Sequence, residues 1–393
     1  MRTLLLTLLA LSPAAASSIW PAPRSQTTTD RSLVHLSPNF KISVIGGPSP
    51  STFLSAAVNE YDTIIRRLPA DPAATFGLLE VHVASSDVAL SLGVDESYTL
   101  QTKTSKPFLI TGQPTTTATL TANTVFGALR GLETFVQLVD ANATLAGGPA
   151  SIPAACLIED SPRFQYRGLM MDTARHFYPV DTIKHTIGAM MASKLNVLHL
   201  HMTDDQSWPV ESLSVPELAL AGAFRVHGQA MVYSSADIKD LLAFAEARGV
   251  LIIAEFDMPA HSSSWAAAFP QDMITKANYT EGGGVGGGGC SKMPFSHGDT
   301  FDPRVGKSTA YARIDSFLGD MIALFGLSGA NSGRFLHLGG DEVPTACWAS
   351  SPAVVEWMKA EGIAPGNWTA VEQRFVEKVA GGPAVGNVSL MYW

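Results

Sequence analysis

The sequence predicts an α/β protein, an incomplete (β/α)8 (TIM) barrel with about five of eight strands, preceded by a small α+β domain. Two observations predict it. From Arg167 onward, short apolar strands alternate with helical segments, which is typical of a parallel sheet buried on both faces. Each strand is also followed by polar residues, and such barrels build their active sites at the carboxyl ends of the strands. A doubly wound sheet would gather its ligands mainly at one switch point, so the ring is favoured.

The composition indicates a large core and excludes two classes of partner. The chain has 393 residues, of which 46% are hydrophobic and 16% charged, against ~25% charged in an average soluble protein. This length favours two domains. The formal net charge of -9 argues against nucleic acid, which needs a basic face. No polybasic run points to a membrane surface.

The N-terminal stretch "MRTLLLTLLALSPAAASS" has the pattern of a secretory signal peptide, which we place at residues 1–17. A buried N-terminal helix is the alternative, and the apolar run is too short to span a bilayer, which takes ~20 residues. We therefore expect an extracellular protein, or one in a lysosome- or vacuole-like compartment. Four glycosylation sequons agree with secretion: Asn142, Asn278, Asn367 and Asn387.

Residues 18–160 are predicted to form the α+β domain. The strand-like stretches are "FKISVIG", "LLEVHVAS", "ESYTLQT", "KPFLITG" and "TATLTA". A helix with apolar residues at helical spacing is expected over 124–141. The segments "GGPASIP" and "EDSPRF" mark a boundary near residue 160.

Residues 161–393 are predicted to form the partial barrel. Strands are expected at 166–172, 195–202, 250–257, 334–340 and 387–393, and helices at 180–194, 234–249, 309–325 and 369–380. Five strands alone would leave an open sheet edge, so we expect a truncated form of a longer protein rather than a different fold. The glycine tract 281–289 is interpreted as a surface insertion, because no G-K-[ST] follows it to cradle a phosphate.

Two adjacent acids, Asp341 and Glu342, follow the fourth strand in "RFLHLGGDEVPTACW". Adjacent residues of a regular strand point to opposite faces, but Gly339 and Gly340 allow that alternation to break. Both carboxylates could then enter one cavity, where one pKa rises and that group becomes a general acid. Such a pair suits glycosidic bond cleavage. A solvated acidic turn is the alternative for the dipeptide alone.

Four longer motifs carry a family resemblance. The stretches "RGLMMDTARHF", "KLNVLHLHMTDDQSWPVES", "LIIAEFDMPAHSSSW" and "FLHLGGDEVPTACW" together resemble the β-N-acetylhexosaminidases of glycoside hydrolase family 20. The resemblance spans Arg167 to Trp393, and "GALRGLETFVQLV" resembles the family's N-terminal accessory domain. It implies that the 2-acetamido group of the substrate attacks the anomeric carbon and that configuration is retained. Glu342 then matches the general acid/base, and Asp341 matches the residue that orients the acetamide.

The resemblance also implies the surrounding groups. Arg175 matches the arginine that binds sugar hydroxyls, and the alternative is an Arg paired with Asp172. Asp204 and His261 match a dyad that tunes the acid, with Asp257 and His201 expected to support it.

Trp393 matches an aromatic wall of the sugar subsite, although a Trp in this position is otherwise more often plain core. Three cysteines allow one disulfide and one leftover thiol. The resemblance pairs Cys290 with Cys347 and leaves Cys156 as a buried thiol.

The chain departs from the family pattern after Trp393, where the family barrel continues with three more strands that carry the tyrosine of the acetamide clamp. We therefore expect an impaired enzyme. The implied substrates are oligosaccharides or glycans ending in N-acetylglucosamine or N-acetylgalactosamine, chitin fragments among them, with no cofactor. Homodimers are common in the family.

Two other functions compete with this one. A non-catalytic sugar-binding protein would use Arg175 and Trp393 without turnover. A metal-dependent hydrolase would use His199 and His201, an H-x-H pair on one strand face. Apart from His261, we find no further histidine at the end of a predicted strand that could complete the ligand set. We therefore expect no metal site there.

Overall fold

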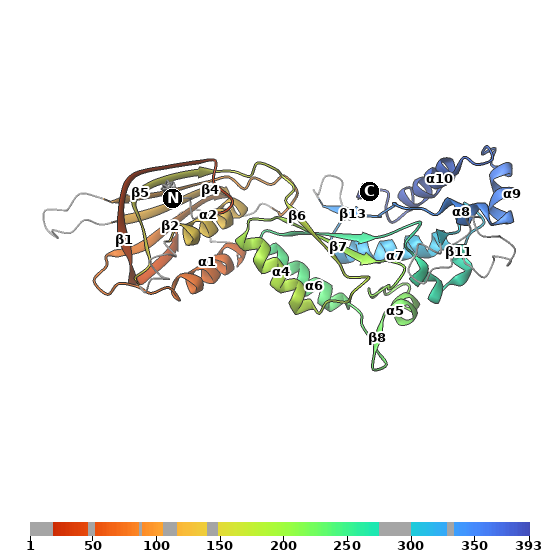
Figure 1. Cartoon of the computed structure of the whole chain (residues 1–393), viewed down its shortest axis with the longest axis horizontal. Helices are drawn as coiled ribbons and strands as arrows, with labels where there is room; N and C mark the ends of the chain where they lie inside the picture. The colour runs from red at the N-terminus through yellow and green to blue at the C-terminus, as the bar shows by residue number, and fades with distance from the viewer. Residues whose placement is uncertain are drawn as a thin grey trace, which may run out of the picture. The chain divides into compact units, whose positions relative to one another are not determined.

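The computed structural model describes residues 19–45, 52–85, 89–104, 116–139, 148–274, 300–327 and 334–393. The chain forms two compact units, which Figure 1 colours along the sequence. Unit 1 comprises Met1–Val88 and Asp95–Arg163, and unit 2 comprises Ala89–Val94 and Phe164–Trp393. The signal peptide predicted at 1–17 and the glycine tract lie outside the described residues.

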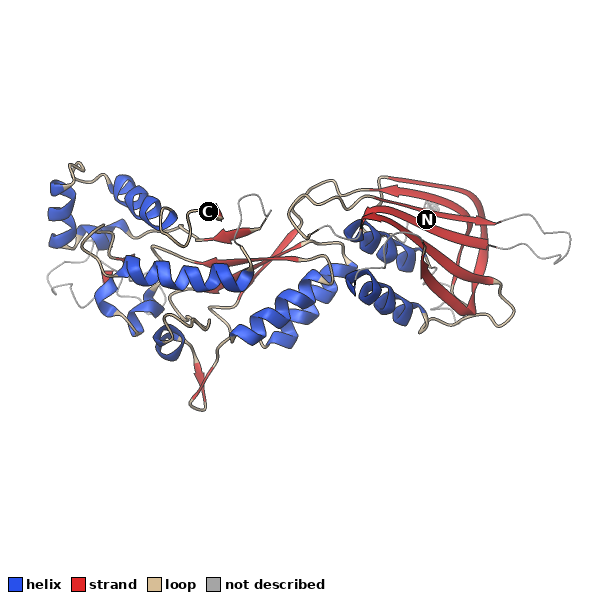
Figure 2. Cartoon of the chain, turned by 180° about the vertical axis from the view of Figure 1, so that it is seen from behind, coloured by secondary structure: helices blue, strands red, loops and turns tan. Residues whose placement is uncertain are grey.

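The described residues of unit 1 form a five-stranded closed sheet with two helices. Its strands follow the order β1-β2-β4-β3-β5 around the ring, with bounds β1 Ser25–Val44, β2 Phe76–Ser85, β3 Tyr98–Thr104, β4 Thr116–Thr124 and β5 Ser151–Asp160. Helix α2 (Val125–Leu138) packs on the strands and helix α1 (Thr52–Ile65) packs on α2 (Figure 2). Gly131 permits this close packing, because a Cβ there would lie 2.2 Å from the Leu120 side chain.

Helix α2 begins where the sequence predicts it. The Thr124 side chain caps the helix by accepting a hydrogen bond from the Gly127 amide. Strand β5 and helix α1 were not predicted. The "SIPAACLIED" stretch overlaps "GGPASIP" and "EDSPRF", the two segments that we interpreted as a boundary, yet it pairs with β1 on one side and β3 on the other. The strand predicted in "KPFLITG" lies outside the described residues.

Unit 2 contains a parallel sheet of five strands in the order β6-β7-β10-β13-β14. Their bounds are β6 Gly168–Asp172, β7 Val197–Thr203, β10 Leu251–Phe256, β13 Phe335–His337 and β14 Ser389–Met391. Spatial order equals chain order with no reversal, which is the arrangement of a (β/α)8 barrel and not of a doubly wound sheet. The predicted partial barrel of five strands is therefore confirmed.

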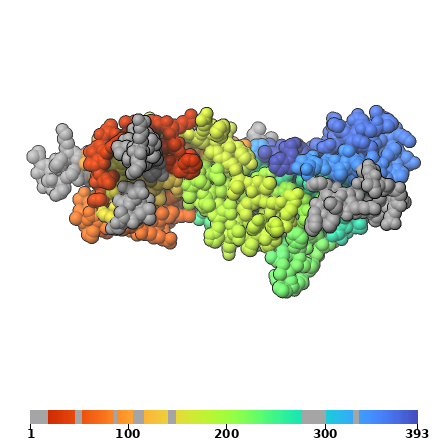
Figure 3. Space-filling model, in the orientation of Figure 1, coloured from red at the N-terminus to blue at the C-terminus, as the bar shows by residue number. Residues whose placement is uncertain are grey.

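Four helices connect these strands as predicted: α4 Val180–Ala192, α6 Ser235–Glu246, α7 Ala310–Phe325 and α10 Trp368–Ala380. Short elements in the connections were not predicted. They are α5 Glu217–Gly222, β8 Arg225–Val226, β9 Gln229–Ala230, the 3-10 turns η1 Ser263–Ala267 and η2 Pro270–Asp272, β11 Met273–Ile274, β12 Thr300–Phe301, α8 Thr345–Ala349 and α9 Pro352–Ala360. The β8–β9 hairpin projects from unit 2 as a green lobe (Figure 3).

The core of unit 2 lies between the sheet and its helices. Every residue of β7 and β10 is buried, and α7 contributes Phe317, Leu318 and Met321 to the same cluster. This burial makes the central strands a fixed frame for the side chains at their carboxyl ends. None of the described helices has both the length and the apolar character needed to span a membrane.

Candidate active site

Polar side chains line up across the parallel sheet at its carboxyl end. The strand register places Asp172 beside His201, His201 beside Glu255, and Glu255 beside His337. Residues that share a row of a parallel sheet point to the same face. Four neighbouring strands thus present one polar row, above which the strand-end loops carry the remaining candidate residues.

The turn after β13 sets the direction of the two adjacent acids. Gly339 and Gly340 have φ values of 64° and 104°, and Glu342 itself has a φ of 52°. These left-handed angles break the strand alternation at the position where the sequence predicts a break. The Gly340 amide donates to Asp257 Oδ1 at 3.0 Å, which ties the turn to the end of β10.

Both acids converge on His261. Its Nε2 lies 3.9 Å from Asp341 Oδ1 and 3.5 Å from Glu342 Oε2, and its Nδ1 lies 3.5 Å from Asp204 Oδ1. The His261 side chain is 3% exposed, whereas those of Asp341 and Glu342 are 42% and 59% exposed. The two carboxylates therefore face the same open side of a buried imidazole. Within the described part of the chain, Asp341 Oδ1 is buried without a hydrogen-bond partner.

Arg175 lies beside Asp204 and is held by two acids. Its Nη1 is 2.7 Å from Asp172 Oδ2 and its Nη2 is 2.7 Å from Asp204 Oδ2. The pairing with Asp172 that we considered as an alternative is thus present, and the guanidinium also reaches Asp204. Because the Arg175 side chain remains 38% exposed, part of its donor edge faces solvent.

Glu255 is the buried centre of the polar row. Its Oε2 lies 2.8 Å from His199 Nε2 and 2.7 Å from His201 Nδ1. His201 Nε2 lies 2.8 Å from Asp204 Oδ2. Since ionised carboxylates only accept hydrogen bonds, both His201 nitrogens must donate, and this imidazole is a cation.

The pKa shifts agree with that assignment. Burial lowers the pKa of His201, but hydrogen bonds to Asp204 and Glu255 outweigh it and raise the pKa to about 10. Burial raises the pKa of Glu255, and the hydrogen bonds from its histidines reverse this and lower it. For Asp204, burial is likewise outweighed by His201 and His261, so the pKa falls to about 2.

Two further groups near the acids hold protons. Burial raises the pKa of Asp257 to about 8, against the opposing Gly340 amide. Burial lowers the pKa of His261, but Asp204 outweighs it and raises the pKa to about 9. These pKa values favour a cationic His261 beside Asp341 and Glu342, and a protonated Asp257, at neutral pH.

A comparison with known families decides the assignment. The family described as glycosyl hydrolase family 20, catalytic domain, matches residues 164–393. The chain belongs to glycoside hydrolase family 20. A second match, described as beta-acetyl hexosaminidase like, covers residues 19–138, which belong to unit 1 except for Ala89–Val94. The resemblance carried by the four sequence motifs is thereby confirmed.

Individual family members show how much of the chain is shared. The β-hexosaminidase subunit beta of Felis catus is 34% identical over 387 residues, covering 94% of this chain and 65% of the cat protein. β-Hexosaminidase 1 of Arabidopsis thaliana is 34% identical over 87% of this chain and 59% of its own length. The Flavobacterium johnsoniae chitobiase structure superposes with a TM-score of 0.74 at 27% identity, covering 96% of this chain and 52% of that chain.

Sequence reasoning missed Glu255 and His337. We counted His261 as the only further histidine at a strand end, but His337 ends β13, with Nδ1 3.2 Å from Glu255 Oε1. The signal was present: an acid in the apolar run "LIIAEF" needs buried partners, and the strands on either side carry "HLH" and "FLH". His337 also brings three possible metal ligands, His199, Glu255 and His337, within 4.8 Å of one another, so the expected absence of a metal stays a prediction.

The remaining predicted residues are three cysteines and four glycosylation sites. Cys156 is a free, buried thiol, as expected, and Cys347 is disulfide-bonded. Cys290, Asn142 and Asn278 lie outside the described residues. Asn367 and Asn387 are exposed, which leaves glycosylation at both sterically open.

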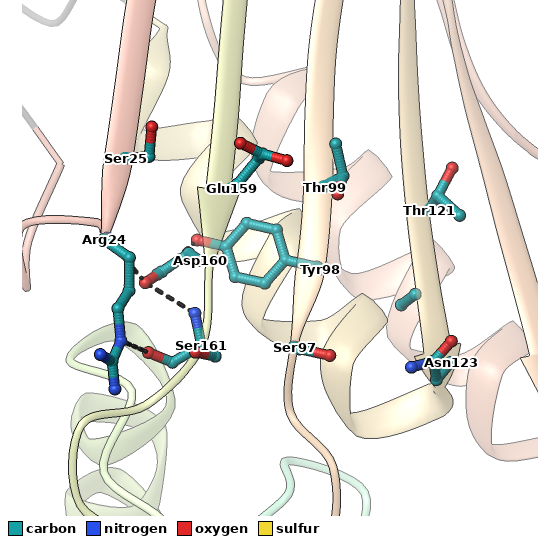
Figure 4. A pocket seen from close by; sticks show the side chains of 11 residues that line it. Arg24, Ser25, Ser97, Tyr98, Thr99, Thr121, Asn123, Glu159, Asp160 and Ser161 are labelled. Atoms are coloured by element: carbon teal, nitrogen blue, oxygen red, sulfur yellow. Dashed lines mark hydrogen bonds between the residues drawn. The ribbon is translucent and has the colours of Figure 1, made fainter.

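Unit 1 contains a separate hollow of about 380 Å³ at the ends of its strands (Figure 4). Two adjacent acids, Glu159 and Asp160, line it, but the chain itself engages one of them: Asp160 accepts from the amides of Arg24 and Ser161 and from the Tyr98 hydroxyl. Both acids lie outside the residues 164–393 that match the catalytic domain, so the candidate active site is the one at the end of the parallel sheet.

The histidines predict how stability changes with pH. The folded-state pKa values of His201 and His261 lie above their unfolded values, so the folded state binds more protons above pH 6.5. The free energy of unfolding is therefore expected to fall as pH rises from 6.5 towards 10, by up to about 1.4 kcal/mol per pH unit for each proton. Urea unfolding at several pH values measures this.

A matched pair of variants tests whether His201 contributes to this change of the unfolding free energy with pH. His201→Gln should flatten it, whereas replacing the exposed His185 with Gln should leave it unchanged. A slope that stays the same in His201→Gln would contradict a cationic His201.

Proposed function

We propose that this chain is an exo-acting, retaining β-N-acetylhexosaminidase that removes terminal N-acetylglucosamine or N-acetylgalactosamine. One observation carries the proposal: Asp341 and Glu342 converge on one imidazole, and a buried Asp341 oxygen has no hydrogen-bond partner in the described chain. A substrate amide N–H would supply that partner. Membership of family 20 supports the same reaction.

The proposed reaction uses the substrate's own amide as nucleophile. Its carbonyl oxygen attacks the anomeric carbon while the bond to the leaving oxygen breaks. Glu342 gives its proton to that oxygen, and Asp341 accepts the amide N–H and balances the positive charge of the oxazolinium ring. Water then attacks the anomeric carbon, the bond between that carbon and the amide oxygen breaks, and the water gives a proton back to Glu342. Two displacements at the same carbon leave its configuration retained.

The neighbouring groups suit a sugar ring. Arg175 presents a planar donor edge for vicinal hydroxyls, and the Trp393 ring, with the residue 61% exposed, offers an apolar face for sugar C–H groups. His261 lies 3.9 Å from Asp341 Oδ1 and 3.5 Å from Glu342 Oε2 and so faces both carboxylates. The names of the relatives, hexosaminidase and chitobiase, support N-acetylhexosamine ends, including those of chitin fragments, as substrates.

Substrate pairs test the proposal. We expect release of 4-nitrophenol from its N-acetyl-β-glucosaminide but not from the β-glucoside, because a 2-hydroxyl cannot form the oxazolinium ring. EDTA should have no effect, since no metal takes part. Equal rates on both substrates would contradict the proposal, and loss of activity with EDTA would favour the metal-dependent alternative.

Two expectations about the whole protein stay predictions. Secretion with glycosylation at Asn367 and Asn387 is tested by expression in a eukaryotic host and glycosidase treatment. A homodimer is tested by light scattering.

A further inference from the structure

Glu255 occupies the centre of the sheet and carries a buried charge that no step of the proposed reaction uses. It lies on the middle strand, with His201 on one side and His337 on the other in the same row. Its exposure is 0%. An isolated buried carboxylate is costly, so its contacts must compensate for the lost hydration.

The two carboxylate oxygens of Glu255 accept hydrogen bonds from different side chains. Oε2 accepts from His199 Nε2 and His201 Nδ1 at 2.8 and 2.7 Å. Oε1 accepts from Trp393 Nε1 at 2.8 Å. The Trp393 ring also packs on His199 and His337, with centroids 5.7 and 5.0 Å away. The indole orientation is therefore set by one hydrogen bond and two ring contacts, all of which depend on this cluster.

Glu255 is also connected to Arg175, through His201 and Asp204. His201 lies between Glu255 and Asp204. Its Nδ1 is 2.7 Å from Glu255 Oε2, and its Nε2 is 2.8 Å from Asp204 Oδ2. Asp204 in turn holds Arg175 at 2.7 Å. The sequence of contacts is Trp393, Glu255, His201, Asp204 and Arg175, so Glu255 is connected to Trp393 directly and to Arg175 through His201 and the second buried carboxylate, Asp204.

We propose that Glu255 is a positioning residue that fixes the Trp393 ring and the Arg175 guanidinium in one arrangement for the sugar. The assignment of those two groups to the sugar rests on the proposed function, but the connection between them does not. Glu255 touches no substrate itself and acts through its hydrogen-bonded neighbours. Both oxygens must accept, which a carboxylate does and an amide cannot.

The first experiment follows Trp393 directly. The chain is labelled with 5-fluorotryptophan, and the Trp393 and Trp265 signals in the fluorine NMR spectrum are assigned by their loss in Trp393→Phe and Trp265→Phe. Glu255→Gln keeps the size of the side chain but turns an N–H₂ group towards the donors on one side. We expect the Trp393 signal to shift and the Trp265 signal to stay in place.

Asp272→Asn is the matched control. Asp272 is also fully buried and accepts from a tryptophan, with Trp265 Nε1 3.1 Å from Oδ2, and it pairs with Arg313. This variant should move the Trp265 signal and not that of Trp393. If folded Glu255→Gln leaves the Trp393 signal unmoved, the proposal is overturned.

The second experiment needs no Glu255→Gln protein. In nitrogen NMR spectra of the unaltered chain at pH 8, both ring nitrogens of His201, assigned with His201→Gln, should be protonated. A folded wild-type protein with a neutral His201 would break the connection between Glu255 and Asp204 and overturn the proposal.

Kinetics then separate positioning from chemistry. Glu255→Gln is expected to lower kcat/KM by about 10²-fold, with most of the loss in KM, because misplaced binding groups weaken substrate binding. Glu255→Asp, which keeps the charge, should recover part of this. A loss confined to kcat with unchanged KM would contradict the proposal. If the wild-type chain turns over no N-acetylhexosaminide, the proposed function fails, while the two NMR experiments still decide the role of Glu255.

Discussion

Replacing Glu342 with Gln is expected to lower kcat on a 4-methylumbelliferyl N-acetyl-β-glucosaminide by about 10²- to 10⁴-fold, the usual contribution of a positioned general acid. The amide has no proton of suitable pKa to give to the leaving oxygen, while the size of the side chain hardly changes. Because Arg175 and Trp393 are untouched, KM should change little. Steady-state kinetics with purified protein measure both constants.

Two controls make this result specific. A dinitrophenyl leaving group needs almost no protonation, so Glu342→Gln should lose much less rate in the first step with that substrate. Glu361→Gln removes an exposed carboxylate that pairs only weakly with Arg374, at 3.3 Å, and should retain wild-type turnover. Full activity of Glu342→Gln would exclude Glu342 as the acid. If neither protein turns over and both bind the sugar equally, the non-catalytic binding alternative is favoured.

Gly339→Ala is expected to abolish activity and destabilise unit 2. A Cβ at this position would lie 1.9 Å from Asp257 Oδ1, and the φ of 64° is already unfavourable for alanine. Strain of the left-handed angle costs about 1–2 kcal/mol, and overpacking typically adds about 1–3 kcal/mol. Asp257 would have to move and release the Gly340 amide, which would rotate Asp341 and Glu342 away from His261. Urea unfolding and kinetics on the same protein measure both effects.

Gly362→Ala separates strain from the steric clash. Gly362 has a φ of 70°, close to that of Gly339, but nothing lies within 4 Å of an added Cβ. We expect it to cost only the strain, about 1–2 kcal/mol, with activity retained. Equal losses of stability and activity in the two variants would contradict a role for the Gly339–Asp257 contact in aiming the acids.

The sequence predicted the catalytic half of the fold well because its signals are local. Each parallel strand is a short apolar run that is followed by polar residues. The number of strands and the location of the site can therefore be predicted from the order of apolar and polar residues. In unit 1 the same reasoning missed β5 and α1. The β5 stretch contains a proline and is stabilised by pairing with strands distant in the sequence, which no local pattern reports.

The candidate site was predictable only in part for the same reason. The turn at Gly339 and Gly340 and the acids after it are visible in the sequence, and the structure places them around His261. Glu255 and His337 were missed because their importance comes from register: three neighbouring strands must align before His201, Glu255 and His337 lie in one row. Register across a parallel sheet depends on the helices that connect the strands, so it is a property of the folded unit.

The most direct test of the account compares substrates whose acetamide carries zero, one, two or three fluorine atoms. Each fluorine withdraws electrons from the carbonyl oxygen and weakens it as a nucleophile, while the chain supplies only Asp341 to steady the amide and Glu342 to protonate the leaving group. If the amide is the nucleophile, kcat/KM is expected to fall steeply with each added fluorine. A rate that does not depend on fluorine would mean that the amide is not the nucleophile and would contradict the account.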